Sequence, residues 1–190
     1  MRSASAVGVG LLYLLAAGLA SAQNRISNSE FHTNVSGWTP DAGDLFEWDP
    51  LDWQASPSSG SARLTADAAG QFVAARTICM PAGLLQMELF GRIRFAGGQA
   101  GQGAARIGLA TFDDPGCLGV YSSDTTENIF STTTDTWVPV SIHSTGGGVF
   151  MRVSLLLVWT GGGAVSVLFD HVIAGPVGTT PVALQSFTVE

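Results

Sequence analysis

The chain has 190 residues, with eight arginines and no lysine against 15 acidic residues, and a formal net charge of −7. A nucleic-acid-binding protein neutralises phosphates with a basic surface, so this composition predicts no nucleic-acid partner and no attraction to an anionic membrane surface. The length is typical of a single domain that buries a sizeable core.

The first 22 residues have the pattern of a secretory signal peptide. Arg2 is the one charge in this stretch, residues 7–19 are mostly apolar, and Ala20–Ala22 supplies the small residues that signal peptidase reads. The apolar run of about 13 residues is shorter than the roughly 20 that a membrane-spanning helix needs. We therefore expect cleavage before Gln23, export to the periplasm or the medium, and no membrane span in the mature chain.

Short segments rich in β-forming residues follow, and the 3.6-residue periodicity of amphipathic helices is missing. Period-two alternation is clearest over 85–95, where Leu89, Ile93 and Phe95 face one way while Arg92 and Arg94 face the other. Glycine clusters at 97–103, 146–148 and 161–163 predict turns or close backbone approaches. The expected strands are 24–31, 44–48, 61–66, 71–78, 85–95, 104–112, 118–122, 137–143, 149–159 and 164–173.

This series of strands predicts an all-β fold, an antiparallel β-sandwich of the jelly-roll type. We assign residues 1–22 to the signal peptide and residues 23–175 to the sandwich domain. Residues 176–190 form a C-terminal tail or an added strand.

Two cysteines, Cys79 and Cys117, remain after signal cleavage. An even number of cysteines in an exported chain predicts a disulfide, which in the chain-entropy model contributes roughly 3–4 kcal/mol. The alternative is a pair of free buried thiols. Two thiols cannot form a structural zinc site, which takes four ligands.

The segment between Asp41 and Trp53 combines acidic side chains with tryptophans and has no basic residue. Aromatic rings stack on the apolar face of a sugar, and carboxylates accept hydrogen bonds from its hydroxyls. Trp48, Trp53, Asp49 and Asp52 are therefore candidate ligand-binding residues, and the alternative is that the tryptophans pack in the core or at its rim. Trp159, just before three glycines, is a secondary candidate.

Nothing in the sequence has the spacing of a catalytic motif. The nucleophile elbow of α/β-hydrolases is missing, and the three histidines are scattered. Among 15 acids, some pair always lies at the separation used in glycoside hydrolysis, so proximity by itself predicts nothing. We expect a protein that is not an enzyme.

Three short motifs resemble those of a known family. Asn28–Phe31 and Val35–Thr39 resemble the opening, and Val167–Val172 the last strand, of carbohydrate-binding modules with the galactose-binding-like jelly-roll fold. The similarity spans roughly residues 26–175. It implies a secreted, non-catalytic domain that recognises a carbohydrate or a cell-surface polymer. The alternatives are a structural or adhesive exoprotein that has no sugar site and a glycan-active hydrolase.

The same resemblance implies a structural calcium ion near the start of the first strand and the Asp of the last strand. By position its ligand would be Asp170, with Glu30 as a possible second ligand. This sequence has His32 where the family usually has Glu, and calcium prefers six to eight oxygen ligands. The alternative is that Asp170 is a hydrogen-bonded carboxylate that caps the N-terminal strand.

Overall fold

The computed structural model describes residues 24–67, 71–83, 86–144 and 147–177. The predicted signal peptide, and the predicted tail beyond Val177, lie outside this range. The described residues form strands, turns and loops without a helix, so none of their elements is a helix that could cross a membrane.

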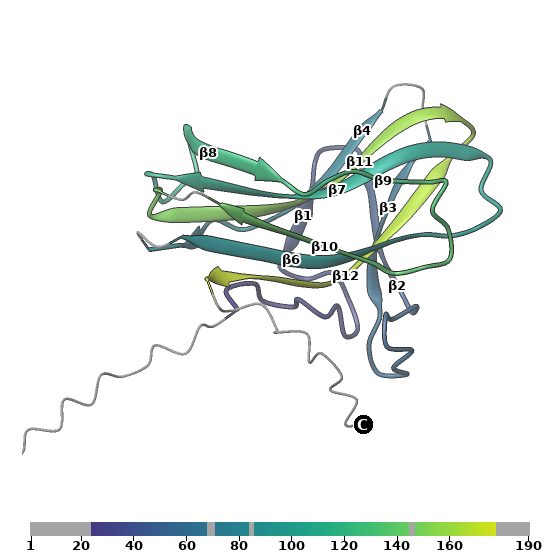
Figure 1. The fold of residues 1–190 in the computed structure, drawn as a ribbon, viewed down its shortest axis with the longest axis horizontal. Helices are drawn as coiled ribbons and strands as arrows, with labels where there is room; N and C mark the ends of the chain where they lie inside the picture. The colour runs from purple at the N-terminus through teal and green to yellow at the C-terminus, as the bar shows by residue number, and fades with distance from the viewer. Residues whose placement is uncertain (1–23, 68–70, 84–85, 145–146, 178–190) are drawn as a thin grey trace, which may run out of the picture.

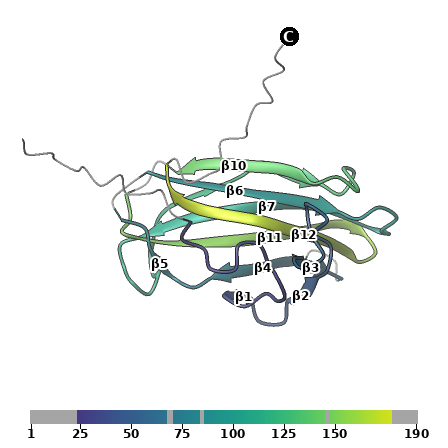
Figure 2. The ribbon, with the colours of Figure 1, turned by 90° about the horizontal axis from the view of Figure 1, so that it is seen from below.

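Two antiparallel sheets pack face to face as the layers of a sandwich (Figures 1 and 2). Sheet A has the order β1-β4-β11-β7-β8, with β5 beside β11 and β9 beside β7, and sheet B has the order β10-β6-β12-β3-β2. The all-β antiparallel sandwich predicted from the sequence is confirmed. The strands of sheet A are β1 (Trp38–Pro40), β4 (Phe72–Thr77), β5 (Met80–Pro81), β7 (Gly101–Phe112), β8 (Val120–Thr125), β9 (Ile129–Phe130) and β11 (Phe150–Gly162). Those of sheet B are β2 (Leu45–Asp49), β3 (Ser61–Ala66), β6 (Met87–Phe95), β10 (Val138–Ser144) and β12 (Val165–Pro176).

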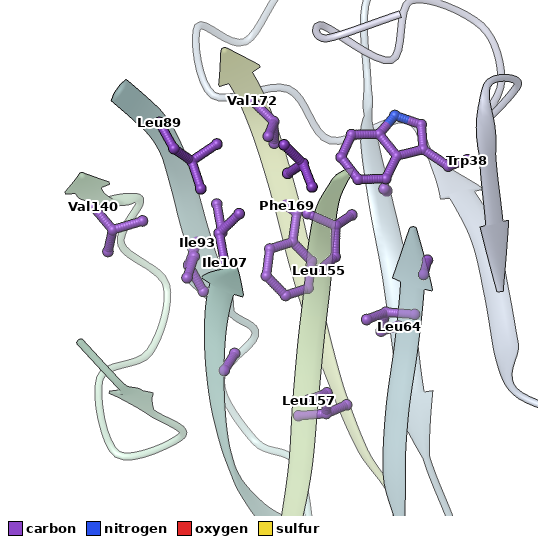
Figure 3. Packing of buried hydrophobic residues seen from close by; sticks show 14 of the residues in the cluster. Trp38, Leu64, Leu89, Ile93, Ile107, Val140, Leu155, Leu157, Phe169 and Val172 are labelled. Atoms are coloured by element: carbon purple, nitrogen blue, oxygen red, sulfur yellow. The ribbon is translucent and has the colours of Figure 1, made fainter. Parts of the chain in front are cut away.

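The core lies between the sheets and is made by alternate residues of each strand (Figure 3). On β6, Leu89, Ile93 and Phe95 are fully buried, while Arg92 and Arg94 point away from the core, as their alternation predicts. Burying a large apolar side chain stabilises the fold by about 1.5–3 kcal/mol, so this alternation determines which face of each strand turns inward. Trp38 also lies in the core, with its ring 5.7 Å from that of Phe31.

The prediction of a first strand over residues 24–31 is wrong. The segment forms turns, yet it runs beside β12 and bonds to it: the Arg25 N–H donates to the Ala174 carbonyl at 2.7 Å, and the Val172 N–H donates to the Ser29 carbonyl at 2.9 Å. Asn28 and Phe31 have positive φ angles of 55° and 43°, which a regular strand cannot contain. The segment therefore covers the edge of a bulge instead of extending a ladder.

The glycine-rich turns are shorter than predicted because the long strands continue into them. β7 begins at Gly101 and β11 ends at Gly162, and these two glycines are paired. A side chain at Gly101 would collide with the carbonyls of Gly163 and Ala164, so the close backbone approach expected of these glycines is present.

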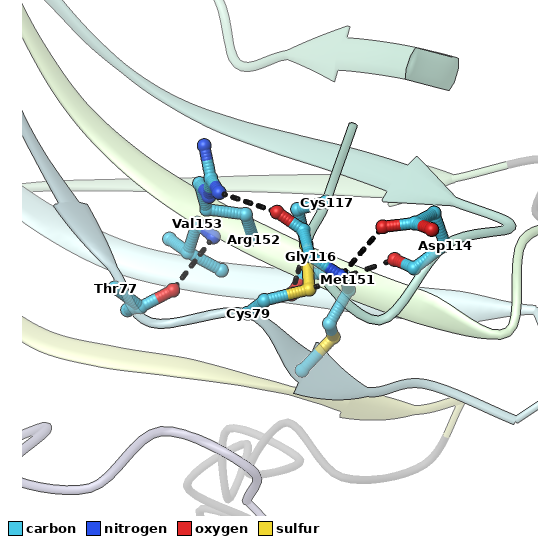
Figure 4. Close-up of a disulfide and its surroundings, with 8 residues drawn as sticks. All are labelled: Thr77, Cys79, Asp114, Gly116, Cys117, Met151, Arg152 and Val153. Carbon is cyan, nitrogen blue, oxygen red and sulfur yellow. Dashed lines mark hydrogen bonds between the residues drawn. A yellow bond between two sulfur atoms is a disulfide. The ribbon is translucent and has the colours of Figure 1, made fainter. Parts of the chain in front are cut away.

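The Cys79–Cys117 disulfide is present, with a Cα–Cα separation of 5.7 Å (Figure 4). It joins the segment after β4 to the turn between β7 and β8. Since β4 and β7 lie on either side of β11, the bond links both neighbours of the central strand at one end of sheet A. Asp114 shapes the turn, because its side chain accepts the Gly116 N–H at 2.7 Å and its carbonyl accepts the Cys117 N–H at 2.9 Å.

Candidate functional site

Trp48, the first candidate ligand-binding tryptophan, is part of the packing at the rim of the core. Its indole N–H donates to the Phe31 carbonyl at 2.7 Å. Its ring also lies against Gly60, where an added Cβ would come within 2.6 Å of the indole. Because both its polar atom and part of its ring face are occupied by the protein, Trp48 connects β2 to the N-terminal segment.

The two candidate carboxylates, Asp49 and Asp52, are buried and already bonded. Asp49 pairs with Arg63 and accepts the Leu51 N–H at 2.8 Å. One oxygen of Asp52 accepts the N–H groups of Gln54 and Ser56, both at 2.8 Å. These contacts shape the loop that follows β2, and the burial of both residues restricts the access of a sugar to their carboxylates.

Trp53 and Trp159, the other two candidates, are both half-buried. The guanidinium of Arg92 lies 3.8 Å from the ring centroid of Trp53, and the His171 ring lies 5.1 Å away. Trp159 packs against the core, and its indole N–H donates to the Gly163 carbonyl at 3.0 Å. Trp53 follows β2 of sheet B and Trp159 lies on β11 of sheet A, so the two do not belong to one sheet surface.

The predicted metal ligands, Glu30 and Asp170, both contact His171. Glu30 Oε1 lies 2.6 Å from His171 Nδ1, and Asp170 accepts the backbone N–H groups of His171 and Trp53 at 2.7 and 3.0 Å. In the part of the chain that the structure describes, no group of three or more His, Cys, Asp or Glu side chains could hold a metal ion. Two carboxylates bonded to nitrogen donors do not supply the six to eight oxygens that calcium takes, so these residues alone do not fit that ion.

Asp170 begins a bulge of β12, where the pairing with β6 shifts register between Asp170 and Ile173. Asp170 is fully buried. The pKa of its carboxyl is raised to about 8. Burial is the main cause, the two N–H donors act against it, and the nearby charges of Asp52 and Glu30 add to it. The bulge places His171 at a φ of 50°. The structure thus brings Asp52 from the loop after β2 and Glu30 from the N-terminal segment close to Asp170 on β12.

The outer face of sheet A carries a second set of candidate residues, which we call the sheet A face. One row across it runs Phe72, Val158, Ala104, Phe130, from β4 through β11 and β7 to β9. Phe72 and Phe130 are large apolar side chains that are 46% and 53% exposed. With strands about 4.8 Å apart, the two rings stand on positions about 14 Å apart.

Three of the arginines also stand on the sheet A face: Arg76 on β4, Arg106 on β7 and Arg152 on β11. Arg106 is opposite Leu156, and Arg76 is opposite Ser154, two residues from Arg152 along β11. Arg76 is bonded to Asp41. Burial, and then the charge of Arg152, lower the pKa of Arg76. Both guanidinium groups line one pocket, so the two cations repel one another.

A pocket of about 280 Å³ opens where β1, β4 and β11 meet on this face. It is lined by Thr39, Pro40, Asp41, Arg76, Thr77 and Arg152. Rings that can stack, guanidinium donors and a hollow thus occur on one sheet surface, a combination suited to holding a polyhydroxylated chain.

Sequence reasoning missed this face. Alternation over 71–78 does place Phe72 on the side opposite Val73, so an exposed ring on β4 could have been found. Phe130 belongs to the two-residue strand β9, which no periodicity indicates.

No family model and no curated protein matches this sequence. Solved structures do match its fold. The xylan-binding CBM22-1 domain of Paenibacillus barcinonensis Xyn10C is 17% identical with a TM-score of 0.57, and the match covers 82% of this chain and 96% of that one. TmCBM61, solved with beta-1,4-galactotriose, is 10% identical with a TM-score of 0.57, and 82% and 99% of the two chains are covered.

Larger enzymes contain the same fold as one part. The MgGH51 α-L-arabinofuranosidase, solved with arabinose, is 17% identical with a TM-score of 0.59, and the match covers 82% of this chain and 26% of that one. The chain thus spans about a quarter of that enzyme and almost the whole length of the isolated modules. Its fold is the β-sandwich of carbohydrate-binding modules, as the sequence motifs imply.

Proposed function

We propose that this protein is a secreted, non-catalytic domain that binds carbohydrate on the sheet A face. The observation that carries the proposal is the row of Phe72 and Phe130, two exposed rings on one sheet surface that also holds arginines and a pocket. A polysaccharide chain presents apolar C–H faces to such rings and hydroxyls to the charged and polar groups between them.

The comparisons support this choice over other uses of the fold. Modules matched over nearly their whole length are described as xylan-binding or were solved with a β-1,4-linked galactose oligomer. We therefore take β-linked polysaccharides such as xylan and galactan as the first ligands to test. A fold by itself hosts many functions, so the residues of the sheet A face carry the proposal.

Secretion is part of the same proposal. The Cys79–Cys117 disulfide persists in oxidising compartments, which agrees with the signal-peptide pattern of residues 1–22. An extracellular or periplasmic location would place the domain beside polysaccharides.

Affinity electrophoresis in gels containing xylan or β-1,4-galactan tests the site. We expect Phe72→Ala and Phe130→Ala each to weaken binding by about tenfold, which corresponds to about 1.4 kcal/mol, because each loses a stacking surface. Leu45→Ala is the matched control, since Leu45 is 52% exposed on β2 of the other sheet. Binding that survives loss of both rings would contradict the assignment of this face.

The site predicted from the acidic segment is tested in the same gels with Trp53→Ala. Its ring is half-buried under Arg92, and Asp49 and Asp52 are bonded within the protein, so we expect at most a small change. A large loss of binding with an unchanged melting temperature would move the site to the loop after β2.

Two alternatives predict different results with the same protein. A structural or adhesive exoprotein without a sugar site would bind none of the polysaccharides. A glycan-active hydrolase would release reducing sugar from them, whereas a non-catalytic domain leaves the polymer intact. Incubation with xylan and galactan followed by a reducing-sugar assay separates these cases.

The structural calcium stays a prediction that rests on the family resemblance. If an ion binds at Asp170, further oxygens must complete its ligand set, and Asp170 would be held ionised. Adding calcium to chelator-stripped protein would then raise the melting temperature, and Asp170→Asn would remove that response. An unchanged melting temperature would show that Asp170 serves hydrogen bonding alone.

A further inference from the structure

The arginines of this acidic protein differ in their surroundings on the two sheets. On sheet B, Arg63 pairs with Glu47 and Asp49, and Arg94 pairs with Asp135. The third arginine of that sheet, Arg92, lies over the Trp53 ring. On the sheet A face, the ion pair found among the described residues is that of Arg76 with Asp41. Arg106 and Arg152 therefore leave an excess of positive charge on one surface of a chain whose net charge is −7.

The excess is concentrated in the pocket between β1, β4 and β11. Its lining contains two guanidinium groups, Arg76 and Arg152, and one carboxylate, Asp41, so one positive charge is uncompensated. The lowered pKa of Arg76 has the proximity of Arg152 as one of its causes, so an anion placed between them would relieve repulsion.

Arg152 has donor capacity left for such an anion. One terminal nitrogen lies 3.5 Å from the Gly116 carbonyl, and the guanidinium carbon lies 5.6 Å from the centroid of the Phe112 ring (Figure 4 shows the first contact). Within the described residues, its Nε is buried and has no hydrogen-bond partner. A carboxylate can accept two parallel hydrogen bonds from one edge of a guanidinium, so a carboxylate is a preferred partner of an arginine.

The pocket is also in reach of the aromatic row. Arg76 and Phe72 lie four residues apart on β4, which is about 13 Å along a strand. A polysaccharide stacked on the rings could therefore place a charged substituent in the pocket.

We propose that the pocket formed by Thr39, Asp41, Arg76 and Arg152 binds the carboxylate of a uronic acid substituent on an otherwise neutral polysaccharide. This inference rests on the proposed function and names the ligand class of the same face. The single uncompensated charge favours a monoanion over a phosphate dianion. The net negative charge of the whole protein disfavours densely charged polymers, so sparse uronate groups fit better than a polyuronate.

The test compares two forms of one polymer. Glucuronoxylan is bound before and after chemical reduction of its carboxyl groups, which leaves the xylan backbone and removes the charge. We expect the native polymer to bind about tenfold more tightly at low ionic strength, and the difference to shrink as salt is added.

Variants locate the effect. Arg152→Gln should abolish the preference, so that the variant binds the native and the reduced polymer equally, while Arg152→Lys should keep only part of the preference because it loses the planar fork. Arg25→Gln, which removes an exposed arginine of the N-terminal segment, is the matched control for net charge and should behave like the wild type. Equal melting temperatures establish that the variants are folded.

The outcomes separate this inference from the function on which it rests. Equal binding of native and reduced polymer would overturn the uronate site and leave the carbohydrate-binding function in place. Failure to bind xylan, galactan or either form of glucuronoxylan would overturn both. Sulfate groups can also be introduced on a neutral polysaccharide. Tight, Arg152-dependent binding of that sulfated polymer would overturn the choice of carboxylate.

Discussion

Among the described acids, Asp170 has the most strongly raised pKa, because a carboxyl group with a usual pKa near 3.8 is placed where no solvent reaches it. Two backbone N–H groups hold its oxygens, while Asp52 and Glu30 add nearby negative charge. Burial dominates, so its pKa is raised to about 8. The carboxyl joins the loop after β2 to the bulge of β12, and its protonation state affects both segments.

This pKa predicts a dependence of stability on pH. Between about pH 4 and pH 8 the folded state holds a proton that the unfolded chain has released, so the free energy of unfolding should fall as the pH rises through that range. In the presence of chelator, we expect a decrease of about 1–3 kcal/mol between pH 5 and pH 8 by urea unfolding.

Asp170→Asn provides the comparison for that measurement. The amide cannot ionise, so the variant should lack this part of the slope, although it should be less stable because its NH₂ group faces a backbone donor. Parallel pH curves for the two proteins would contradict a raised pKa at Asp170.

At the scale of elements, the end of sheet A near Arg152 is held by the hairpin of β7 and β8. The turn contains Cys117 at a positive φ of 53°, and Cys79 from the segment after β4 is bonded to it. Gly116, in the same turn, presents its carbonyl to Arg152. The disulfide therefore fixes two strands that flank β11 and also the turn beside the proposed uronate pocket.

Replacing both cysteines by serine tests the energetic part of this statement. The bond closes a loop with a sequence separation of 38, so its loss should lower the free energy of unfolding by about 3–4 kcal/mol in the chain-entropy model. We expect the variant to keep its β-sheet circular dichroism and to melt at a lower temperature. The midpoint of urea unfolding measures the change, and the wild type in reducing agent is the control. A change below about 1 kcal/mol would show that the packing of β11 alone holds this end of the sheet.

For the whole molecule, the sandwich separates two kinds of surface. On sheet B, Arg63 and Arg94 pair with acids, Arg92 lies over the Trp53 ring, and the N-terminal segment covers part of β12. The sheet A face keeps exposed rings and arginines that are only partly paired. This asymmetry lets a protein with a net negative charge present a local positive pocket, because at physiological ionic strength screening limits the influence of distant charges to about 8 Å.

The sequence by itself determined the parts of this protein that depend on local pattern. Alternation identified the core-facing residues of β6, the glycine clusters after β6 and β11 marked connections that cross from one sheet to the other, and the spacing of turns predicted an antiparallel sandwich. Each of these follows from contacts between residues close in sequence or from the period of two that any strand obeys. The cysteine pair was predictable from its number alone, since an exported chain with two cysteines has one pairing available.

Tertiary structure alone decided which residues meet on a surface. β4, β11 and β7 are neighbours in sheet A although they are far apart in the chain, so the grouping of Arg76, Arg152 and Arg106 depends on strand order and register. The same order sets Phe72 and Phe130 in one row. Conversely, the acids and tryptophans of 41–53 are neighbours in sequence, but folding packs Trp48 against the core, and Asp49 and Asp52 accept backbone N–H groups. The physical reason is that neighbours in sequence alternate between faces, whereas a binding surface is assembled across strands whose order no local pattern encodes.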